Sequence, residues 1–400
     1  MRSRALVLTL ALTAAARGRA DDPPTYHAQV APILQARCQV CHREGGVGPF
    51  ALESYDDAAG WAAMLAEVVE TRRMPPWHAD PAVGHFENSR RLSDAERETL
   101  LAWVRAGTPE GDPQASPPPR TWPEGWALGE PDAVLSADAV QVPAAGVLEY
   151  RYSEVRSDFG EDKWVTGIEV QVGAREVVHH VLVFLRFPDG TQRKLKGGLK
   201  GYFASALPGD MVAMLPPGTG KRVPRGTSFV FQIHYAPNGR AQRDTTRLGL
   251  HFGDPAEIER EAQTVALFDT ELRLPPGAPD TAVRARYTFK EDVFLYGLTP
   301  HMHLRGKSFD YLLLLPDGTT QRVLSIPAYD FNWQTTYRLA EPLRVPRGAK
   351  MLGVAHYDNS AENPANPDPT ATVRFGEQTF DEMMIGYMDV YPVEARKATK

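Results

Sequence analysis

"RVPRGTSFVFQIHY" at residues 222–235 and "RVPRGAKMLGVAHY" at residues 344–357 are two copies of one pattern in a chain of 400 residues. In each copy a Pro-Arg-Gly turn precedes a mostly apolar run, which predicts a turn leading into a β-strand. A second pair, "VVHHVLVFLRFPDGTQRKL" at 177–195 and "FDYLLLLPDGTTQRVL" at 309–324, predicts strand, Pro-Asp-Gly turn and strand. The pairs follow in the same order, displaced by 122 and 128 residues. We therefore predict two similar β-sandwich domains in tandem, residues 136–262 and 263–393.

The part of the chain before these repeats has a different texture. Residues 21–112 predict a compact helical unit, and "SDAERETLLAWVRAG" at 93–107 predicts its last helix. Ser93 and Glu96 have the spacing of a capping box, and Gly107 ends the pattern. Seven prolines between residues 108 and 134 then predict an extended proline-rich linker, assigned to residues 113–135, and residues 394–400 form a tail.

Composition and charge limit the classes of function. A hydrophobic content of 42% suffices for real cores, and a net charge of −6 without any basic tract argues against a nucleic-acid partner. Residues 1–20 combine arginines, a short apolar run and small residues, which predicts a signal peptide. An uncleaved amphipathic anchor is the alternative. No stretch is long enough to span a bilayer, so we predict a periplasmic or secreted protein without a membrane span.

The only two cysteines lie in "CQVCH" at residues 38–42. Cys-x-x-Cys-His is the attachment signature of a c-type haem, so Cys38 and Cys41 would carry the haem and His42 would be one axial ligand. Zinc would need four ligands, and no second cysteine pair exists. Export agrees with this prediction, since covalent haem attachment belongs outside the cytoplasm. The segment "RRMPPWHADPAVGHF" offers three candidates for the other axial ligand, Met74, His78 and His85.

Residues 26–112 resemble the small cytochrome c domains that carry a Met-Pro-Pro-Trp segment and finish on an Ala-Trp-Val helix. The resemblance implies a small all-α cytochrome c domain in which Met74 is the distal haem ligand. A thioether opposite imidazole raises the reduction potential, which suits an electron carrier.

Five histidines of the β region stand in groups, at 179–180, 234 and 301–303. His301 and His303 are spaced i, i+2, so in a strand they share a face and can close on one metal. Adjacent His179 and His180 need a local distortion, or different ring nitrogens, to do the same. Imidazole does not select one metal, but a thioether favours Cu(I). "FDEMMIGYMDVYP" offers three thioethers, Met383, Met384 and Met388.

Residues from about 136 to 393 resemble the copper type II monooxygenases, the family of dopamine β-monooxygenase and peptidylglycine α-hydroxylating monooxygenase. The resemblance rests on His-His before apolar residues, Gln-x-His-Tyr, His-x-His-Leu-x-Gly and Glu-Met before Tyr-Pro, in family order. It implies two antiparallel jelly-roll sandwiches with one copper ion in each. The electron-storing copper would be bound by His179, His180 and His234. The oxygen-activating copper, the catalytic one, would be bound by His301, His303 and Met383.

The chain also departs from that family. It has no cysteine left for the disulfides of the animal members. Thr299 stands where the peptide-amidating branch has an arginine, which argues against peptide amidation, whereas Tyr387 matches a substrate-side tyrosine of that branch. His356 is the repeat counterpart of His234 and is either a packed side chain or an additional ligand.

The expected fold class is a small all-α cytochrome c domain followed by two tandem antiparallel β jelly-roll sandwiches. The expected function is hydroxylation of a C–H bond of a small organic molecule by molecular oxygen, using two copper ions and one covalent haem c. Electrons would come from an external donor, an ascorbate-like reductant or a periplasmic redox protein, through the haem. An electron-transfer or copper-binding protein without hydroxylation is the alternative, and a sensor or scaffold with vestigial copper sites is a third hypothesis.

Overall fold

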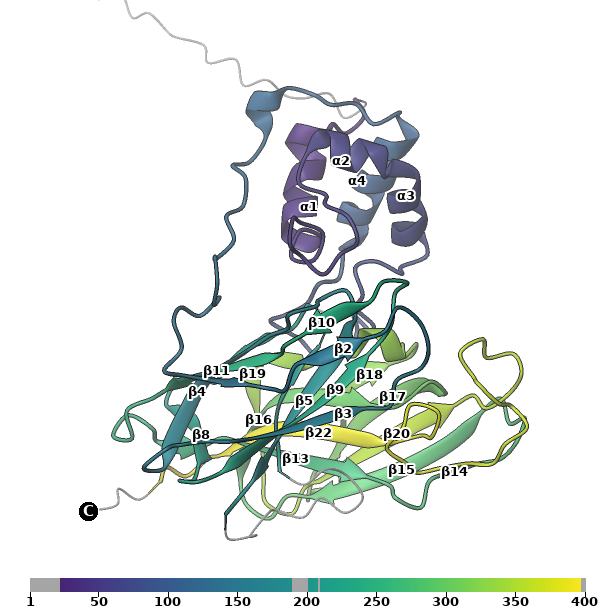
Figure 1. Cartoon of the computed structure of the whole chain (residues 1–400). Helices are drawn as coiled ribbons and strands as arrows, with labels where there is room; N and C mark the ends of the chain where they lie inside the picture. Colours follow the sequence, from purple (N-terminus) through teal and green to yellow (C-terminus); the bar gives the residue numbers. More distant parts are fainter. Residues whose placement is uncertain (1–21, 189–200, 208, 397–400) are drawn as a thin grey trace, which may run out of the picture.

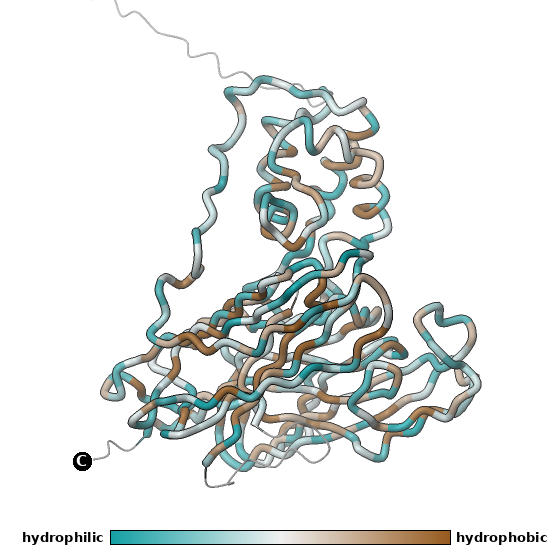
Figure 2. Tube along the Cα trace, in the orientation of Figure 1, coloured by the Kyte–Doolittle hydropathy of each residue, from teal (hydrophilic) through white to brown (hydrophobic). Residues whose placement is uncertain are grey.

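The computed structural model describes residues 22–188, 201–207 and 209–396, in which β-strands predominate and a helical unit stands at one end (Figure 1). The predicted signal peptide lies outside these residues, as do the last residues of the predicted tail. Within the described ranges, no helix is both long enough and apolar enough to cross a bilayer. Hydrophobic positions gather along the strands and in the helical unit, as Figure 2 shows.

The first sandwich consists of two sheets around a core of aliphatic and phenylalanine side chains. Sheet 1 has the order β1 (Ala133–Ser136), β11 (Arg247–Phe252), β4 (Lys163–Gln171), β8 (Thr219–Val223) and β12 (Arg260–Glu261), with β7 (Val212–Met214) on β4. Sheet 2 has the order β3 (Arg151–Arg156), β9 (Ser228–Tyr235), β5 (Val178–Arg186) and β6 (Tyr202–Ala206). A separate pair joins β2 (Val140–Val142) to β10 (Gln242–Asp244).

The second sandwich is built in the same way. Sheet 3 has the order β13 (Gln263–Phe268), β22 (Ile385–Pro392), β16 (Val293–His301) and β19 (Tyr337–Val345). Sheet 4 has the order β15 (Thr281–Thr288), β20 (Lys350–Tyr357), β17 (Gly306–Leu314) and β18 (Thr320–Ile326). A short pair joins β14 (Arg273–Leu274) to β21 (Val373–Arg374). The repeated sequences thus become the inner strands β9 and β20, and β5 and β17, of sheets 2 and 4.

The helical unit has short elements around its own apolar core, in which Trp103 and Leu100 are fully buried. Its elements are the π-helix η1 (Tyr26–Val30), α1 (Ala31–Arg37), α2 (Tyr55–Gly60), α3 (Ala62–Glu70), α4 (Asp94–Arg105) and the 3₁₀ turn η2 (Pro113–Ala115). The predicted capping box of α4 is confirmed, because Ser93 and the N3 residue Glu96 cap each other reciprocally. Gly107 has φ +81° just past the helix end.

The predicted fold class, with a small all-α cytochrome c domain before two antiparallel jelly-roll sandwiches, is wrong. The described chain is mostly strand, and the four α-helices found in it have only 7, 6, 9 and 12 residues. Residues 77–88, which belong to the range assigned to that domain, leave the helices and pack into the second sandwich. The sheets also depart from a purely antiparallel arrangement, because β12 pairs with β8 in parallel.

We call residues 77–88 the docking segment. It runs along the edge strand β19, where Phe86 bridges Leu339 and the amide of Ala340 donates to the carbonyl of His85 (2.9 Å). Trp77 and Phe86 pack around the ring of Tyr337, with centroids 4.9 and 5.5 Å from it. The docking segment therefore hydrogen-bonds to the exposed edge of β19 and packs into the core of the second sandwich. Because these residues belong to the range predicted for the helical unit, that unit is not a separate domain.

The two sandwiches meet through sheets 2 and 3. Tyr202 on β6 stacks on Tyr387 on β22 at 4.3 Å between ring centroids. Leu182 and Phe184, on the face of sheet 2 away from its own core, are only 8% and 2% exposed. The outer face of sheet 2 is therefore buried against the second sandwich, and this is the face on which the candidate site lies.

The predicted proline-rich linker is an extended strap along one side of the molecule (Figure 1). Two tryptophans near its middle make contacts. The guanidinium groups of Arg43 and Arg120 lie over the Trp122 ring, 4.3 and 4.6 Å from its centroid. Trp126 packs on Gly249, where a Cβ would come within 2.7 Å of the indole ring.

Candidate functional site

Three histidines converge on the outer face of sheet 2. His180 on β5 lies directly opposite His234 on β9, and a register shift between Val178 and His180 turns His179 toward the same side. The predicted local distortion at the His-His pair is therefore present as a β-bulge. One ring nitrogen of each histidine lies within 4.8 Å of those of the other two. Within the described ranges, this is the one group of three or more His, Cys, Asp or Glu side chains that meets this geometry.

The ring nitrogens of this cluster suit a metal ion. Nδ1 of His179 and Nδ1 of His180 are 2.9 Å apart, close to the roughly 3 Å expected for two imidazoles bound to one ion at about 2.0–2.1 Å each. On the third ring, Nδ1 of His234 is buried without a hydrogen-bond partner. Buried polar atoms are rarely left unpaired, so this nitrogen fits a bound metal together with the other two rings.

Burial sets the charge of the same rings. It lowers the pKa of His179, places that of His180 well below the ordinary value and brings that of His234 to about 3. The rings are therefore neutral near pH 7, which is the form that binds a metal ion.

His301, at the end of β16, and His303, two residues later, form a second pair, with ring centroids 5.2 Å apart. Nδ1 of His301 is 2.7 Å from Oε1 of Gln334, and Nδ1 of His303 is 3.3 Å from the carbonyl of Asp381. These acceptors fix the proton on Nδ1 of each ring, which leaves Nε2 as the ligand atom. Nε2 of His303 is buried and has no partner. The pair therefore also fits a metal ion.

Met383 follows the buried Glu382. Strands β16 and β22 pair as far as His301 opposite Ile385, and Oε1 of Glu382 accepts from the backbone amides of both His303 and Met383. The Met383 side chain is buried among Ala266, Ile385 and Tyr387, on the face of β22 that meets the first sandwich. The backbone thus brings Met383 next to the His301–His303 pair.

Glu382 holds the turn that carries this pair. Its carboxylate accepts hydrogen bonds from the backbone amides of His303, Met383 and Arg305. Burial raises its pKa to about 7, and the hydrogen bonds from these amides act in the opposite direction. Sequence analysis used this residue only as a motif neighbour of Met383 and missed that it positions His303.

Phe331 connects the two groups of histidines. Its ring stacks on that of His179 (centroids 5.1 Å apart, 16° between planes) and lies 6.0 Å from His234 and 6.1 Å from His303. It belongs to η3 (Phe331–Trp333), a turn between β18 and β19. No sequence signal singled out this turn, beyond two aromatic residues and two amides in "FNWQ".

His356 lies elsewhere. It is in β20 of sheet 4, with Nδ1 2.7 Å from Oδ1 of Asp280 and its side chain 35% exposed. Its counterpart His234 also points away from the core of its own sandwich. The outer face of sheet 2 is covered by the second sandwich, whereas His356 pairs with an exposed carboxylate, so the same repeat position has two different environments.

The residues predicted to hold the haem line one cavity of about 360 Å³, namely Cys38, Cys41, His42 and Met74. Both cysteines are free, and Nδ1 of His42 is 3.1 Å from the carbonyl of Phe50, which leaves Nε2 as a ligand atom. The rest of the lining is largely apolar and includes Val40, Leu52, Leu65 and Val68, together with Trp333 of η3. The cavity therefore fits a covalently attached haem.

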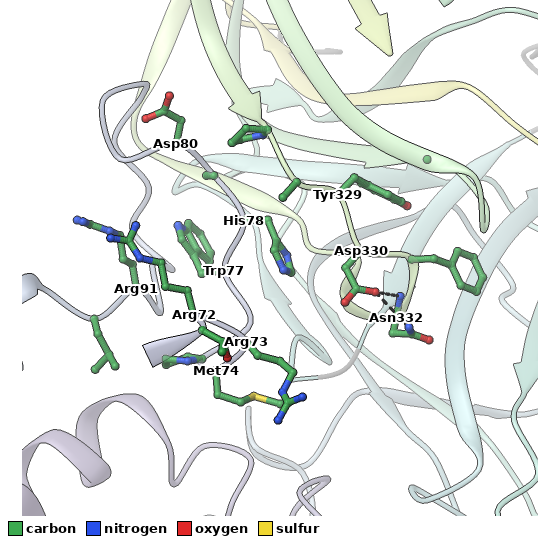
Figure 3. A pocket seen from close by; sticks show the side chains of 18 of the residues that line it. Arg72, Arg73, Met74, Trp77, His78, Asp80, Arg91, Tyr329, Asp330 and Asn332 are labelled. Atoms are coloured by element: carbon green, nitrogen blue, oxygen red, sulfur yellow. Dashed lines mark hydrogen bonds between the residues drawn. The ribbon is translucent and has the colours of Figure 1, made fainter. Parts of the chain in front are cut away.

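The alternative axial candidates lie outside this cavity. His78 lines a neighbouring cavity of about 820 Å³, where Figure 3 shows it on the side that carries Asp330 and Asn332. Burial lowers the pKa of His78, and the carboxylate of Asp330 opposes that shift. His85 is exposed in the docking segment. Of the three candidates, only Met74 lines the cavity that the cysteines line.

The two residues compared with the peptide-amidating branch are adjacent. Thr299 pairs with Tyr387 across β16 and β22. The Thr299 hydroxyl is 3.0 Å from that of Thr336, and the Tyr387 ring is 5% exposed against Tyr202. Tyr387 thus lies between the sandwiches, on the face of sheet 3 that carries His301.

Comparisons with known proteins add little. No family model matches the chain, and no curated protein matches it. Among solved structures, VP54 of PBCV-1 is 9% identical with a TM-score of 0.25, covering 67% of this chain and 97% of that one. The major capsid protein P2 of bacteriophage PM2 is 10% identical with a TM-score of 0.27, covering 66% and 99%. Likenesses at such scores carry no argument about fold or function.

The five neutral histidines predict an acid-labile apoprotein. Burial lowers the pKa of each of His179, His180, His234, His301 and His303. Below about pH 6.5 the unfolded chain binds protons that the folded chain does not, so each ring costs up to about 1.4 kcal/mol of stability per pH unit. Glu382, with its raised pKa, acts in the opposite sense, but it is a single group.

The melting temperature of the metal-free protein should fall by several degrees from pH 7 to 5.5. A His234→Asn variant should show a shallower fall, and a flat wild-type profile would contradict the assignment of buried neutral rings.

Proposed function

We propose that the protein is an exported copper-dependent monooxygenase that hydroxylates a C–H bond of a small organic substrate with molecular oxygen, supplied with electrons through a covalently bound haem. The observation that carries the proposal is the convergence of two histidine groups from facing sheets around Phe331, with unpaired buried ring nitrogens in both. Trp333, two residues after Phe331, lines the cavity that contains Cys38 and Cys41.

The residues would divide the work as follows. His179, His180 and His234 would hold one copper ion, which would supply one-electron redox chemistry. His301, His303 and Met383 would hold the other, which would supply oxygen activation. Cys38 and Cys41 would attach the haem, His42 and Met74 would bind its iron, and the haem would supply electrons. Gln334 and Glu382 orient the rings and backbone of the second set.

Single-turnover kinetics test this proposal. Protein loaded with haem and copper is reduced without oxygen, then mixed with oxygen and candidate substrates. Haem reoxidation that depends on copper and on substrate, with a hydroxylated product in the mass spectrum, would support it. Haem and copper that cycle without any product from a broad substrate panel would instead favour an electron-transfer protein.

The axial ligand of the haem can be tested separately. Met74→Ala should abolish the weak red-edge absorbance of an iron–sulfur bond and lower the reduction potential, because a thioether ligand raises it. His78→Ala is the matched control, since His78 lines the neighbouring cavity, and it should leave both properties unchanged. If His78→Ala removes that band, Met74 is not the ligand.

A further inference from the structure

Four consecutive residues in and after η3 touch every part of the candidate site. Trp333 lines the cavity with Cys38 and Cys41. Phe331, two residues earlier, stacks on His179, and Gln334, one residue later, pairs with His301. The turn therefore spans the space between the haem cavity and both histidine groups.

The path from Trp333 to His179 is short and runs mostly through covalent bonds of the turn. Only Asn332 separates the two aromatic residues, and consecutive Cα atoms lie about 3.8 Å apart. From the Phe331 ring the next step is the stacked His179 ring, at 5.1 Å between centroids. Electron tunnelling weakens steeply with distance and is favoured through bonded atoms and packed rings over open gaps, so this geometry suits a conduit.

The turn is held in place from both sides. Oδ1 of Asp330 accepts from the backbone amide of Asn332 (2.9 Å). The side-chain amide of Gln334 donates to the backbone carbonyl of Phe331 (3.3 Å). The hydroxyl of Tyr329, just before the turn, donates to the carbonyl of Met302 (2.9 Å), between the two histidines of the second pair. Phe331 itself is 7% exposed. The two aromatic side chains are therefore anchored relative to the histidines.

We propose that η3 is the electron conduit of this protein, with Trp333 as the entry from the haem and Phe331 as the exit to the copper bound by His179, His180 and His234. This inference rests on the proposed function. In each transfer one electron leaves the ferrous haem iron, which becomes ferric, and a cupric ion takes it and becomes cuprous. No proton or other group moves in this step.

The test measures electron transfer in the full-length protein, without oxygen or substrate. The protein is loaded with haem and Cu(II), the haem is reduced by a light-triggered donor, and haem absorbance is followed together with loss of the Cu(II) paramagnetic signal. Trp333→Leu and Phe331→Leu are the test variants. Trp126→Leu is the matched control, because Trp126 packs on Gly249 and is not among the residues that line the haem cavity. Haem and copper content are measured for each protein.

The inference predicts that Trp333→Leu slows copper reduction by the haem by roughly 10–100-fold, the size of effect typical of residues around a metal site. Trp126→Leu should keep the wild-type rate, and direct reduction of copper by ascorbate should be unchanged in Trp333→Leu. Equal rates in wild type and Trp333→Leu, with both cofactors loaded, would overturn the conduit alone. A loaded wild-type protein in which the haem keeps its electron would overturn the conduit and also the haem's role as electron donor in the proposed function. A wild-type protein that takes up neither haem nor copper would overturn the proposed function as well.

Discussion

Replacing His234 with alanine should remove one of two copper ions and reduce haem-driven turnover by about a hundredfold or more, beyond the effect of changing outer residues of a metal site. The reason is geometric. His234 is one of three rings whose nitrogens lie within 4.8 Å of one another, and its Nδ1 is buried without a partner. Copper content by elemental analysis and the rate of copper reduction by the haem check this result.

His356→Ala is the matched control for that experiment. His356 is the counterpart of His234 in the repeated sequence, but it pairs with exposed Asp280 on sheet 4. Its loss should leave copper content and turnover unchanged. If His356→Ala removes copper while His234→Ala does not, the assignment of the first site is wrong.

Glu382→Ala should be among the most destabilising single substitutions in the second sandwich. It leaves three buried backbone amides, those of His303, Arg305 and Met383, without their acceptor. Each buried donor that loses its acceptor costs about 1–3 kcal/mol, so the total loss should be several kcal/mol. Denaturant unfolding should show this loss, and the copper at His301, His303 and Met383 should be lost or weakened.

Two further variants sharpen that prediction. Glu382→Gln keeps one acceptor oxygen and should cost less than the alanine. Glu377→Ala removes a carboxylate from an exposed position in the same loop and should change stability by no more than about 0.5 kcal/mol. Equal stabilities of Glu377→Ala and Glu382→Ala would contradict the positioning role of Glu382.

Local sequence patterns predicted the features whose causes are local. The capping box of α4 and the strands of the repeated segments follow from residue types at fixed spacing. Because adjacent residues of a regular strand point to opposite faces, His179 and His180 were expected to need a local distortion or different ring nitrogens to share a metal, and the structure has the distortion, a β-bulge. Local patterns do not predict the different environments of His234 and His356. Their local sequences match, but sheet 2 faces the other sandwich at His234, whereas His356 on sheet 4 pairs with an exposed carboxylate.

The features that sequence did not predict depend on distant partners. Trp77 and Phe86 had no helical or strand period, and their partner Tyr337 lies some 250 residues away in the chain. Phe331, Trp333 and Gln334 acquire their roles only when the helical unit and both sandwiches come together. The expectation of a separate all-α domain failed for the same reason, since the docking segment is stabilised by the second core.

In the proposed function the haem and the two histidine groups together insert one oxygen atom into a C–H bond. Turnover under isotopically heavy dioxygen, with the loaded protein and a haem-specific reductant, tests this reaction. We expect one heavy oxygen atom in the hydroxylated product and the other in water, with two electrons consumed per product. Product oxygen that comes from water, or oxygen consumption without any labelled product, would contradict it.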